Sequence, residues 1–253
     1  MEAYTDFAKV YDVFMDNAPY DKWHEYLHQT LEKYGIKEEL VLDLGCGTGT
    51  LTELLAGDGY DMIGIDNSQE MLNIAMEKKD VSSHEILYLL QDMREFELYG
   101  TVKAVICICD SLNYLLEDED VITTMHLVNN YLDPGGVFIF DFNTVYKYET
   151  VIGDTTIAEN RDECSFIWEN YYHEEERINE YDLTLFVKEE ERYRKFQETH
   201  YQRGYTVEEM TAFVKAAGLS LVGICDADTH EPVTDKSERI YMIARECTKQ
   251  VMK

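Results

Sequence analysis

The chain has 253 residues, 45% of them hydrophobic, which is enough for one large domain or a domain with an insertion. It contains 51 acidic and 22 basic residues, so its formal net charge is −29. A field of this sign repels phosphodiester backbones, and we therefore expect no nucleic-acid partner. A neutral or cationic small molecule suits the charge better.

The cysteines and the apolar segments bear on location. No apolar run approaches the roughly 18 residues of a membrane helix, and the N-terminus has no secretory pattern. Six cysteines are scattered without a C-x-x-C motif, as expected of reduced thiols. We expect a cytoplasmic protein with no membrane partner. Whether it is a monomer or a homodimer stays open.

The first forty residues are rich in aromatic side chains, among them Tyr11 and Trp23. This segment also contains His24-Glu-Tyr-Leu-His28, which has the H-E-x-x-H form of zinc proteases. The motif precedes every predicted strand, and nothing downstream singles out a third ligand. We therefore assign no metal. A zinc hydrolase using His24, Glu25 and His28 is kept as an alternative that a metal analysis tests.

Residues 40–49 are Leu-Val-Leu-Asp-Leu-Gly-Cys-Gly-Thr-Gly, and an apolar segment of helical character follows. This order predicts a buried parallel strand, a tight turn and a helix, the place where open α/β sheets bind nucleotides. The dinucleotide pattern G-x-G-x-x-G would need glycine where Thr50 stands. The phosphate-binding loop would need a lysine that is absent.

The pattern that is present, D-x-G-x-G-x-G, resembles the signature of class I S-adenosylmethionine-dependent methyltransferases. That cofactor has no phosphates, so it needs no phosphate cradle. The resemblance implies that the carboxylate of Asp43 meets the ammonium of the cofactor's amino-acid tail. The glycine loop would leave room for the ribose and the sulfonium, with contacts from Gly45, Cys46, Gly47 and Gly49.

Residues 61–66 predict a second strand that ends in Asp66. An acid at the tip of this strand can accept both ribose hydroxyls, and the resembled class keeps one there. Asn67, followed by Glu70 three residues later, predicts the start of a helix capped by Asn67. We include Asn67 and Met71 among the cofactor contacts. The alternative role for Asp66 is helix capping alone.

Residues 86–90 and 102–109 predict the third and fourth strands. After the third, the resemblance implies that Asp92 and Met93 contact the adenine. After the fourth come Asp110, Asn113 and Tyr114, at the edge where open α/β sheets keep their chemistry. These three residues and Tyr11 are the catalytic candidates, and Asp110 is also a candidate cofactor contact.

The rest of the chain supplies the remaining strands. Helical spacing over residues 121–132 is followed by a fifth strand at 137–143. Thr206-Val-Glu-Glu209 is a capping box that opens another helix. Strands at 219–225 and 239–245 complete seven, and the resemblance implies that the last is antiparallel. Between residues 144 and 205, alternating patterns predict antiparallel strands.

The resemblance also implies roles for the two outlying segments. In relatives of this class an antiparallel insertion here often covers the methyl-acceptor pocket, which makes Tyr172, His173 and His200 candidate substrate contacts. A dimerisation surface is the alternative role for the insertion. The N-terminal segment resembles a helical lid that would place Tyr11 and Trp23 over the cofactor.

The sequence thus predicts an α/β protein with a Rossmann-like seven-stranded methyltransferase sheet, helices on both faces and an antiparallel β insertion. We expect a helical lid (1–39), a cofactor-binding core (40–143), the insertion as substrate cap (144–205) and a C-terminal completion of the sheet (206–253). The implied function is in-line methyl transfer from S-adenosyl-L-methionine to a small-molecule acceptor. A cofactor-binding sensor or scaffold without turnover is the alternative.

Overall fold

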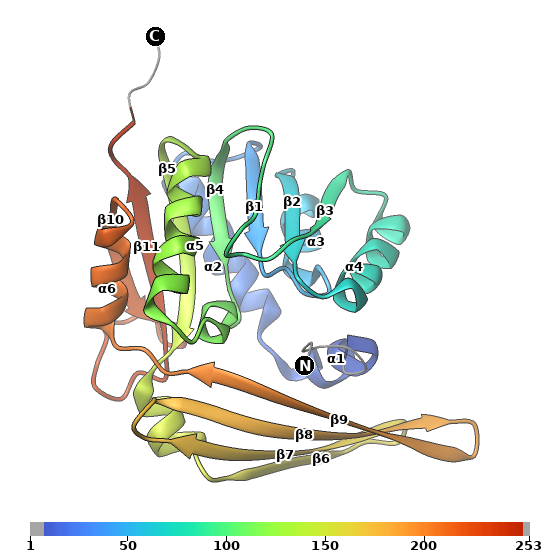
Figure 1. Ribbon diagram of the computed structural model, residues 1–253. Coiled ribbons are helices and arrows are strands. Elements are labelled where there is room, and N and C mark those ends of the chain that lie inside the picture. The colour runs from blue at the N-terminus through green and yellow to red at the C-terminus, as the bar shows by residue number, and fades with distance from the viewer. Residues whose placement is uncertain (1–7, 250–253) are drawn as a thin grey trace.

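The computed structural model describes residues 8–249, which form two sheets (Figure 1). The smaller sheet lies beyond the carboxyl ends of the parallel strands of the larger one. The larger sheet consists of β1 (Leu40–Leu44), β2 (Asp61–Asp66), β3 (Ile86–Leu90), β4 (Val102–Cys107), β5 (Leu132–Asn143), β10 (Leu219–Asp226) and β11 (Arg239–Glu246). The smaller consists of β6 (Thr156–Asn160), β7 (Cys164–His173), β8 (Ile178–Glu189) and β9 (Arg192–Arg203).

The strand order of the larger sheet is β10-β11-β5-β4-β1-β2-β3. β1 runs parallel to both β2 and β4, whereas β11 runs antiparallel to both β5 and β10. The predicted seven-stranded sheet with an antiparallel last strand is therefore confirmed. The chain order reverses between β1 and β4, and open α/β sheets bind ligands at such a point.

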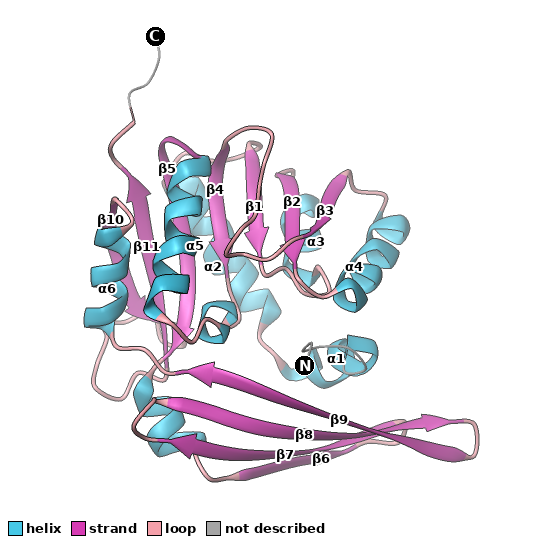
Figure 2. Cartoon of the chain, viewed as in Figure 1, coloured by secondary structure: helices cyan, strands magenta, loops and turns pink. Residues whose placement is uncertain are grey.

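Helices cover both faces of this sheet, as predicted (Figure 2). On one face α5 (Asp118–Tyr131) and α6 (Val207–Ala216) contribute buried side chains to the core, and on the other α2 (Tyr20–Lys33) and α3 (Thr50–Gly57) do so. α4 (Gln69–Ser82) packs beside β3, and α1 (Ala8–Phe14) packs on α4. Three short turns are η1 (Met15–Asn17), η2 (Ser111–Tyr114) and the π-helix η3 (Lys147–Ile152). No helix within residues 8–249 is long and apolar enough to cross a membrane.

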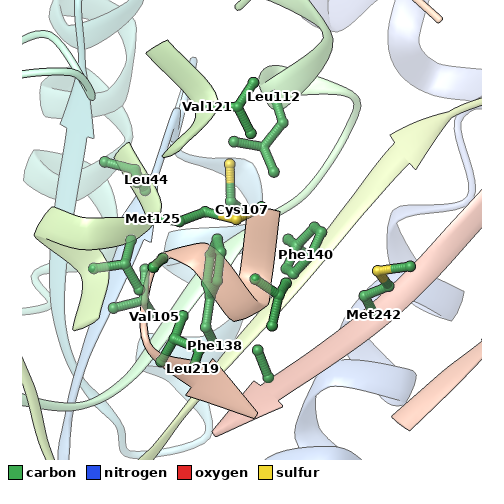
Figure 3. Packing of buried hydrophobic residues seen from close by; sticks show 14 of the residues in the cluster. Leu44, Val105, Cys107, Leu112, Val121, Met125, Phe138, Phe140, Leu219 and Met242 are labelled. Atoms are coloured by element: carbon green, nitrogen blue, oxygen red, sulfur yellow. The ribbon is translucent and has the colours of Figure 1, made fainter. Parts of the chain in front are cut away.

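The parallel strands are apolar on both faces because one core forms between the sheet and α5 and another between the sheet and α2. Val105 and Phe138 of neighbouring strands belong to one buried cluster with Val121 and Met125 of the helix (Figure 3). Burial of each such side chain contributes about 1.5–3 kcal/mol. This packing fixes the strands, and so fixes the loops at their carboxyl ends.

The insertion forms the predicted antiparallel strands, β7 to β9, and adds two elements that the sequence pattern did not predict. β6 is an edge strand without alternating apolar residues, so it carries no period-two signal. Lys147–Ile152 is a π-helix, a rare conformation that is frequent at functional sites.

Several element ends differ from the prediction. β5 begins at Leu132 rather than at residue 137, because the chain becomes extended as soon as α5 ends at Tyr131. β4 ends at Cys107 rather than Cys109, because Cys109 and Asp110 have positive φ angles of 64° and 53°. Their N–H groups donate to the carboxylate of Asp141 instead of to a neighbouring strand. The cap of α4 is Ser68, not Asn67, because the Ser68 hydroxyl accepts the N–H of Met71. The capping box at Thr206 is present as predicted.

Candidate active site

A first cavity opens at the carboxyl ends of β1, β2 and β4, at the reversal of strand order. Ten of the predicted site residues line it: Tyr11, Asp43, Gly45, Cys46, Gly47, Asp66, Asn67, Met71, Met93 and Tyr114. Lining residues that were not predicted are Tyr20, Thr48, Thr50, Leu51, Ile65, Gln91, Ile108, Cys109 and Ser111. Gln91 directly follows a predicted strand and Ser111 comes two residues after another, and these positions were the available signal.

Asp43 lies on β1 beneath the cavity and is 3% exposed. One carboxylate oxygen accepts a hydrogen bond from the Thr52 hydroxyl at 2.6 Å. Burial, with a smaller contribution from the neighbouring Asp66, raises the pKa of the Asp43 carboxyl to about 7, although the Thr52 hydrogen bond opposes the shift. A cationic group bound beside Asp43 would favour the ionised form.

The glycine loop has the backbone that only glycine adopts without strain. The φ angles are 82° at Gly45, 53° at Gly47 and 73° at Gly49. A Cβ at Gly47 would meet no protein atom within 4 Å, so the loop lies against open space there. A Cβ at Gly49 would lie 2.4 Å from the Tyr88 hydroxyl oxygen. Gly49 therefore serves packing and does not line the cavity.

Asp66 connects the tip of β2 to the glycine loop. One of its carboxylate oxygens accepts the N–H of Gly47 at 2.9 Å, and the other accepts the N–H of Ser68 at 2.8 Å. Burial raises the pKa of the Asp66 carboxyl, and these backbone donors oppose the shift. The carboxylate is thus held in one orientation at the cavity wall, while its remaining lone pairs can accept further hydrogen bonds.

A second cavity lies between the larger sheet and the insertion, and it shares Tyr11 and Cys109 with the first. One part of its wall is apolar: Phe14, Met15, Trp23, Ile152, Phe166, Trp168 and Leu183. The other part is polar and includes Asp110, Asn143, Lys147, Gln202 and Arg239. Arg239 and Lys147 were not predicted, because neither belongs to a motif and only the fold brings them here.

Asp110 faces the second cavity rather than the first. Its carboxylate accepts hydrogen bonds from Arg239 at 2.5 Å and from the Gln202 side-chain amide at 2.6 Å. Arg239 also donates to Asp141 at 2.9 Å, and Asp141 is fully buried. The guanidinium therefore bridges two carboxylates and holds the strained turn after β4 in place.

A chain of buried polar groups connects both cavities to the interior of the insertion. The Tyr114 hydroxyl oxygen lies 2.7 Å from that of Tyr181 and 3.2 Å from Nδ1 of His200. The imidazole of His200 stacks on the Tyr181 ring at 4.8 Å, and its Nε2 lies 3.3 Å from the Glu198 carboxylate. Tyr114 lines the first cavity and Tyr181 the second.

Comparison with known proteins identifies the family. Residues 41–136 match the family model of a methyltransferase domain. A protein of Bacillus subtilis (strain 168), putative methyltransferase YqeM, is 39% identical over 96% of this chain and 96% of its own length. A crystal structure of an S-adenosylmethionine-dependent methyltransferase from Clostridium acetobutylicum ATCC 824 superposes with a TM-score of 0.88 at 29% identity, covering 97% of this chain and 100% of that one.

The chain belongs to the S-adenosylmethionine-dependent methyltransferases. A further relative is a dTDP-3-amino-3,4,6-trideoxy-alpha-D-glucopyranose N,N-dimethyltransferase from Streptomyces venezuelae. It is 29% identical over 54% of this chain and 56% of its own length.

The first cavity of this methyltransferase fits S-adenosylmethionine. Asp43 and Asp66 are carboxylates suited to an ammonium group and to hydroxyl groups. The open space beside Gly47 admits a ligand against the main chain. No lysine or arginine lines this cavity among the described residues, as suits a ligand without phosphates.

Two other residues predicted to contact the cofactor lie elsewhere in this methyltransferase. Trp23 lines the second cavity rather than the first, because α2 packs against the sheet on that side. The carboxylate of Asp92 binds the backbone N–H and the guanidinium of Arg94, which holds it away from the first cavity. Arg94 hydrogen bonds lower the pKa of the Asp92 carboxyl.

Several catalytic and substrate candidates are also placed outside the cavities. Asn113 is fully buried and joins η2 to main-chain atoms of Asn143 and Arg203, a structural contact. His173 lies on the outward face of β7 and contacts Glu180 at 2.8 Å. Tyr172 packs beside Gly153 and lines neither cavity. His200 reaches the cavities only through the two tyrosines.

The H-E-x-x-H residues form hydrogen bonds on the surface of α2. His24 and His28 both contact the Asp58 carboxylate, at 2.7 Å and 3.0 Å, and Glu25 accepts from Gln29. Within residues 8–249, no three histidine, cysteine or acidic side chains are arranged to hold a metal ion. The two histidines have structural partners, and the zinc alternative finds no support in this arrangement.

Proposed function

We propose that this methyltransferase binds its cofactor in the first cavity and a small-molecule methyl acceptor in the second. The observation that carries this proposal is that the cavities share Tyr11 and Cys109. A donor in one and an acceptor in the other would meet at these two side chains. In-line transfer needs such a meeting, since positioning supplies much of the rate.

In this proposal Asp66 accepts the ribose hydroxyls, because its carboxylate is already oriented by the Gly47 and Ser68 N–H groups. Asp43 meets the ammonium of the amino-acid tail, directly or through water. Gly45 and Gly47 let the main chain approach the ligand, and Asn67 and Met93 lie along the wall of the same cavity. When bound, S-adenosylmethionine supplies a methyl group that its sulfonium has already activated.

The N-terminal segment and the insertion would close the acceptor side. The rings of Phe14 in α1 and Phe166 in β7 meet edge to face at 4.8 Å. The guanidinium of Arg161, between β6 and β7, binds the Asp16 carboxylate at 2.8 Å. These contacts support a lid role for residues 8–39 and a cap role for residues 144–205, which together would exclude water from the transfer.

The geometry separates the four catalytic candidates. Asp110 holds Arg239 and Gln202, and Asn113 joins main-chain segments, so we assign both to positioning. Tyr11 and Tyr114 remain at the walls of the first cavity. If the accepting atom carries a proton, the Tyr114 hydroxyl, 3.2 Å from Nδ1 of His200, offers a way to receive it, and the Glu198 carboxylate lies 3.3 Å from Nε2 of that imidazole.

A small acceptor is supported by the apolar wall of the second cavity and by a relative whose name specifies an amino-sugar substrate. The test uses radiolabelled S-adenosylmethionine with a cell extract separated into low-molecular-weight, protein and RNA fractions. We expect the full-length enzyme to label the low-molecular-weight fraction. Label confined to protein or RNA would contradict the proposal.

Two neighbouring residues of β7 provide a matched pair of variants for the same assay. Phe166 faces the second cavity, whereas Ile167 lies on the opposite face and is 38% exposed. Phe166→Ala should strongly reduce labelling and spare cofactor binding, while Ile167→Ala should change neither. Equal labelling by both variants would show that the insertion is not the acceptor side.

A further inference from the structure

Hydrogen-bond acceptors in the wall of the second cavity already have donors. Each carboxylate oxygen of Asp110 accepts one hydrogen bond, the first from Arg239 at 2.5 Å and the second from Gln202 at 2.6 Å. The amide oxygen of Gln202 accepts from the Tyr148 hydroxyl at 2.9 Å. These groups hold one another in place, and the Arg239 guanidinium neutralises the charge of Asp110, so the carboxylate does not by itself call for a cationic ligand.

Two hydrogen-bond donors in the same wall have N–H groups that no described residue accepts. The Lys147 ammonium makes one hydrogen bond within residues 8–249, to the Asn143 side-chain oxygen at 3.0 Å, although it can donate three. The indole Nε1 of Trp168 is buried and has no hydrogen-bond partner in the described part of the chain. The buried Trp168 N–H has no partner, which costs free energy that a ligand carrying acceptor oxygens would recover. The half-buried Lys147 ammonium has further N–H groups to donate to the same ligand.

The charges in the wall point the same way. Arg239 contacts two carboxylates, Asp110 and Asp141, so its charge is already matched by direct partners. Lys147 forms no ion pair within 4 Å among residues 8–249, and burial lowers the pKa of its ammonium, as does the nearby Arg239. A bound anion beside Lys147 would stabilise the charged form.

The remainder of the wall is apolar and comes from different elements. Phe14 of α1, Phe166 of β7 and Leu183 of β8 face the cavity, and Lys147 begins the π-helix that adjoins it. This arrangement suits a molecule with one charged end and an apolar body. The overall charge of −29 disfavours anions at long range, so selection of such a molecule would depend on these local donors.

From these contacts we propose that the methyl acceptor is a small carboxylic acid, whose carboxylate is bound by Lys147 and Trp168 and whose body packs on Phe14, Phe166 and Leu183. This inference rests on the proposed function, since it takes the second cavity as the acceptor site. It adds the chemical class of the acceptor and two residues that determine specificity.

The test compares a carboxylate with its uncharged amide. Calorimetry with S-adenosylhomocysteine-saturated enzyme measures the binding of 3-phenylpropanoate and 3-phenylpropanamide. We expect the acid to bind roughly tenfold more tightly, since charge-assisted hydrogen bonds are about twice as strong as neutral ones. Lys147→Met should remove this preference and leave amide binding unchanged. Lys188→Met, which removes a lysine from the exposed end of β8, is the control and should behave as wild type.

Trp168→Phe keeps the ring and removes the N–H, so it should weaken acid and amide alike by a severalfold factor. Three outcomes would overturn the inference. The wild type could bind acid and amide equally, Lys147→Met could keep the preference for the acid, or neither probe could bind. Cofactor binding is measured in the same preparations. Loss of S-adenosylhomocysteine binding would count against the proposed function, whereas intact cofactor binding without carboxylate preference counts only against this inference.

Discussion

Gly47 and Gly35 share a backbone requirement but differ in surroundings. Both have positive φ angles, 53° and 78°, and a Cβ at either would meet no protein atom within 4 Å. Only Gly47 lines the first cavity. Alanine should therefore cost each site a similar strain, about 1–2 kcal/mol of unfolding free energy. In calorimetry, Gly47→Ala should bind S-adenosylhomocysteine more weakly than wild type, whereas Gly35→Ala should not. Equal affinities of the two variants would show that the loop does not approach the ligand.

Asp43 makes stability depend on pH. Because burial raises its pKa from 3.8 to about 7, the folded state binds the proton more tightly than the unfolded state. The contribution of Asp43 is thus fully present below pH 3.8 and is lost as pH rises to about 7. The difference is on the order of 4 kcal/mol.

Asp43→Asn keeps an oxygen for Thr52 but cannot ionise. In urea titrations between pH 4 and pH 8 without ligand, the variant should therefore gain stability over wild type as pH rises. It should also bind the cofactor more weakly, because the ammonium loses its charged partner. Parallel stability curves for the two proteins would contradict the pKa assigned to Asp43.

At the scale of residues, the sequence predicted which side chains lie at the first cavity where position along a strand determines that placement. Asp43 and Asp66 end adjacent parallel strands, so the sheet itself brings them to one edge. Arg239 comes from a distant segment, and its contact with Asp110 is one that no local pattern encodes. Lys147 contacts Asn143 four residues before it, but its place in the second cavity depends on how the insertion folds over the sheet. Asp92 does not line the first cavity for a local reason, since Arg94 two residues later binds its carboxylate.

The element that joins both cavities is α1. Its Asp12 accepts a hydrogen bond from the Thr48 hydroxyl at 2.6 Å and pairs with Lys78 of α4 at 2.7 Å. Its Phe14 contacts Phe166 of the insertion. These contacts tie α1 to the core on one side and to the insertion on the other.

Phe14→Ala removes the contact between α1 and the insertion. Loss of an aromatic pair should lower the local opening free energy of residues 8–17 by about 1–2 kcal/mol. Hydrogen exchange should be faster in this segment. Calorimetry should show weaker S-adenosylhomocysteine binding, because Tyr11 lies on the same helix. Val13→Ala is the matched control, since Val13 is 43% exposed. Unchanged exchange in Phe14→Ala would remove α1 from the closing mechanism.

For elements, period-two patterns predicted β7 to β9 but not which face of the sheet would meet the core. His173 follows Tyr172 and therefore points to the opposite face, where it meets Glu180 on the neighbouring strand. His200 is on the inward face, behind Tyr181. The face depends on how the insertion docks on the larger sheet, which is a long-range property.

For the molecule as a whole, the fold places two cavities in sequence, with Tyr11 and Cys109 at their shared wall. The larger sheet supplies the first cavity through its strand ends, and the insertion completes the second (Figure 1). The central claim is that a cofactor in the first cavity directs its methyl group into the second.

A crystal structure of the full-length enzyme with S-adenosylhomocysteine tests this claim most directly. We predict ribose hydroxyls on the Asp66 carboxylate, the amino-acid tail near Asp43, and the sulfur at the wall formed by Tyr11 and Cys109, facing the second cavity. A ligand that lies in the first cavity with its sulfur directed away from Tyr11 and Cys109, or that binds elsewhere, would contradict the account.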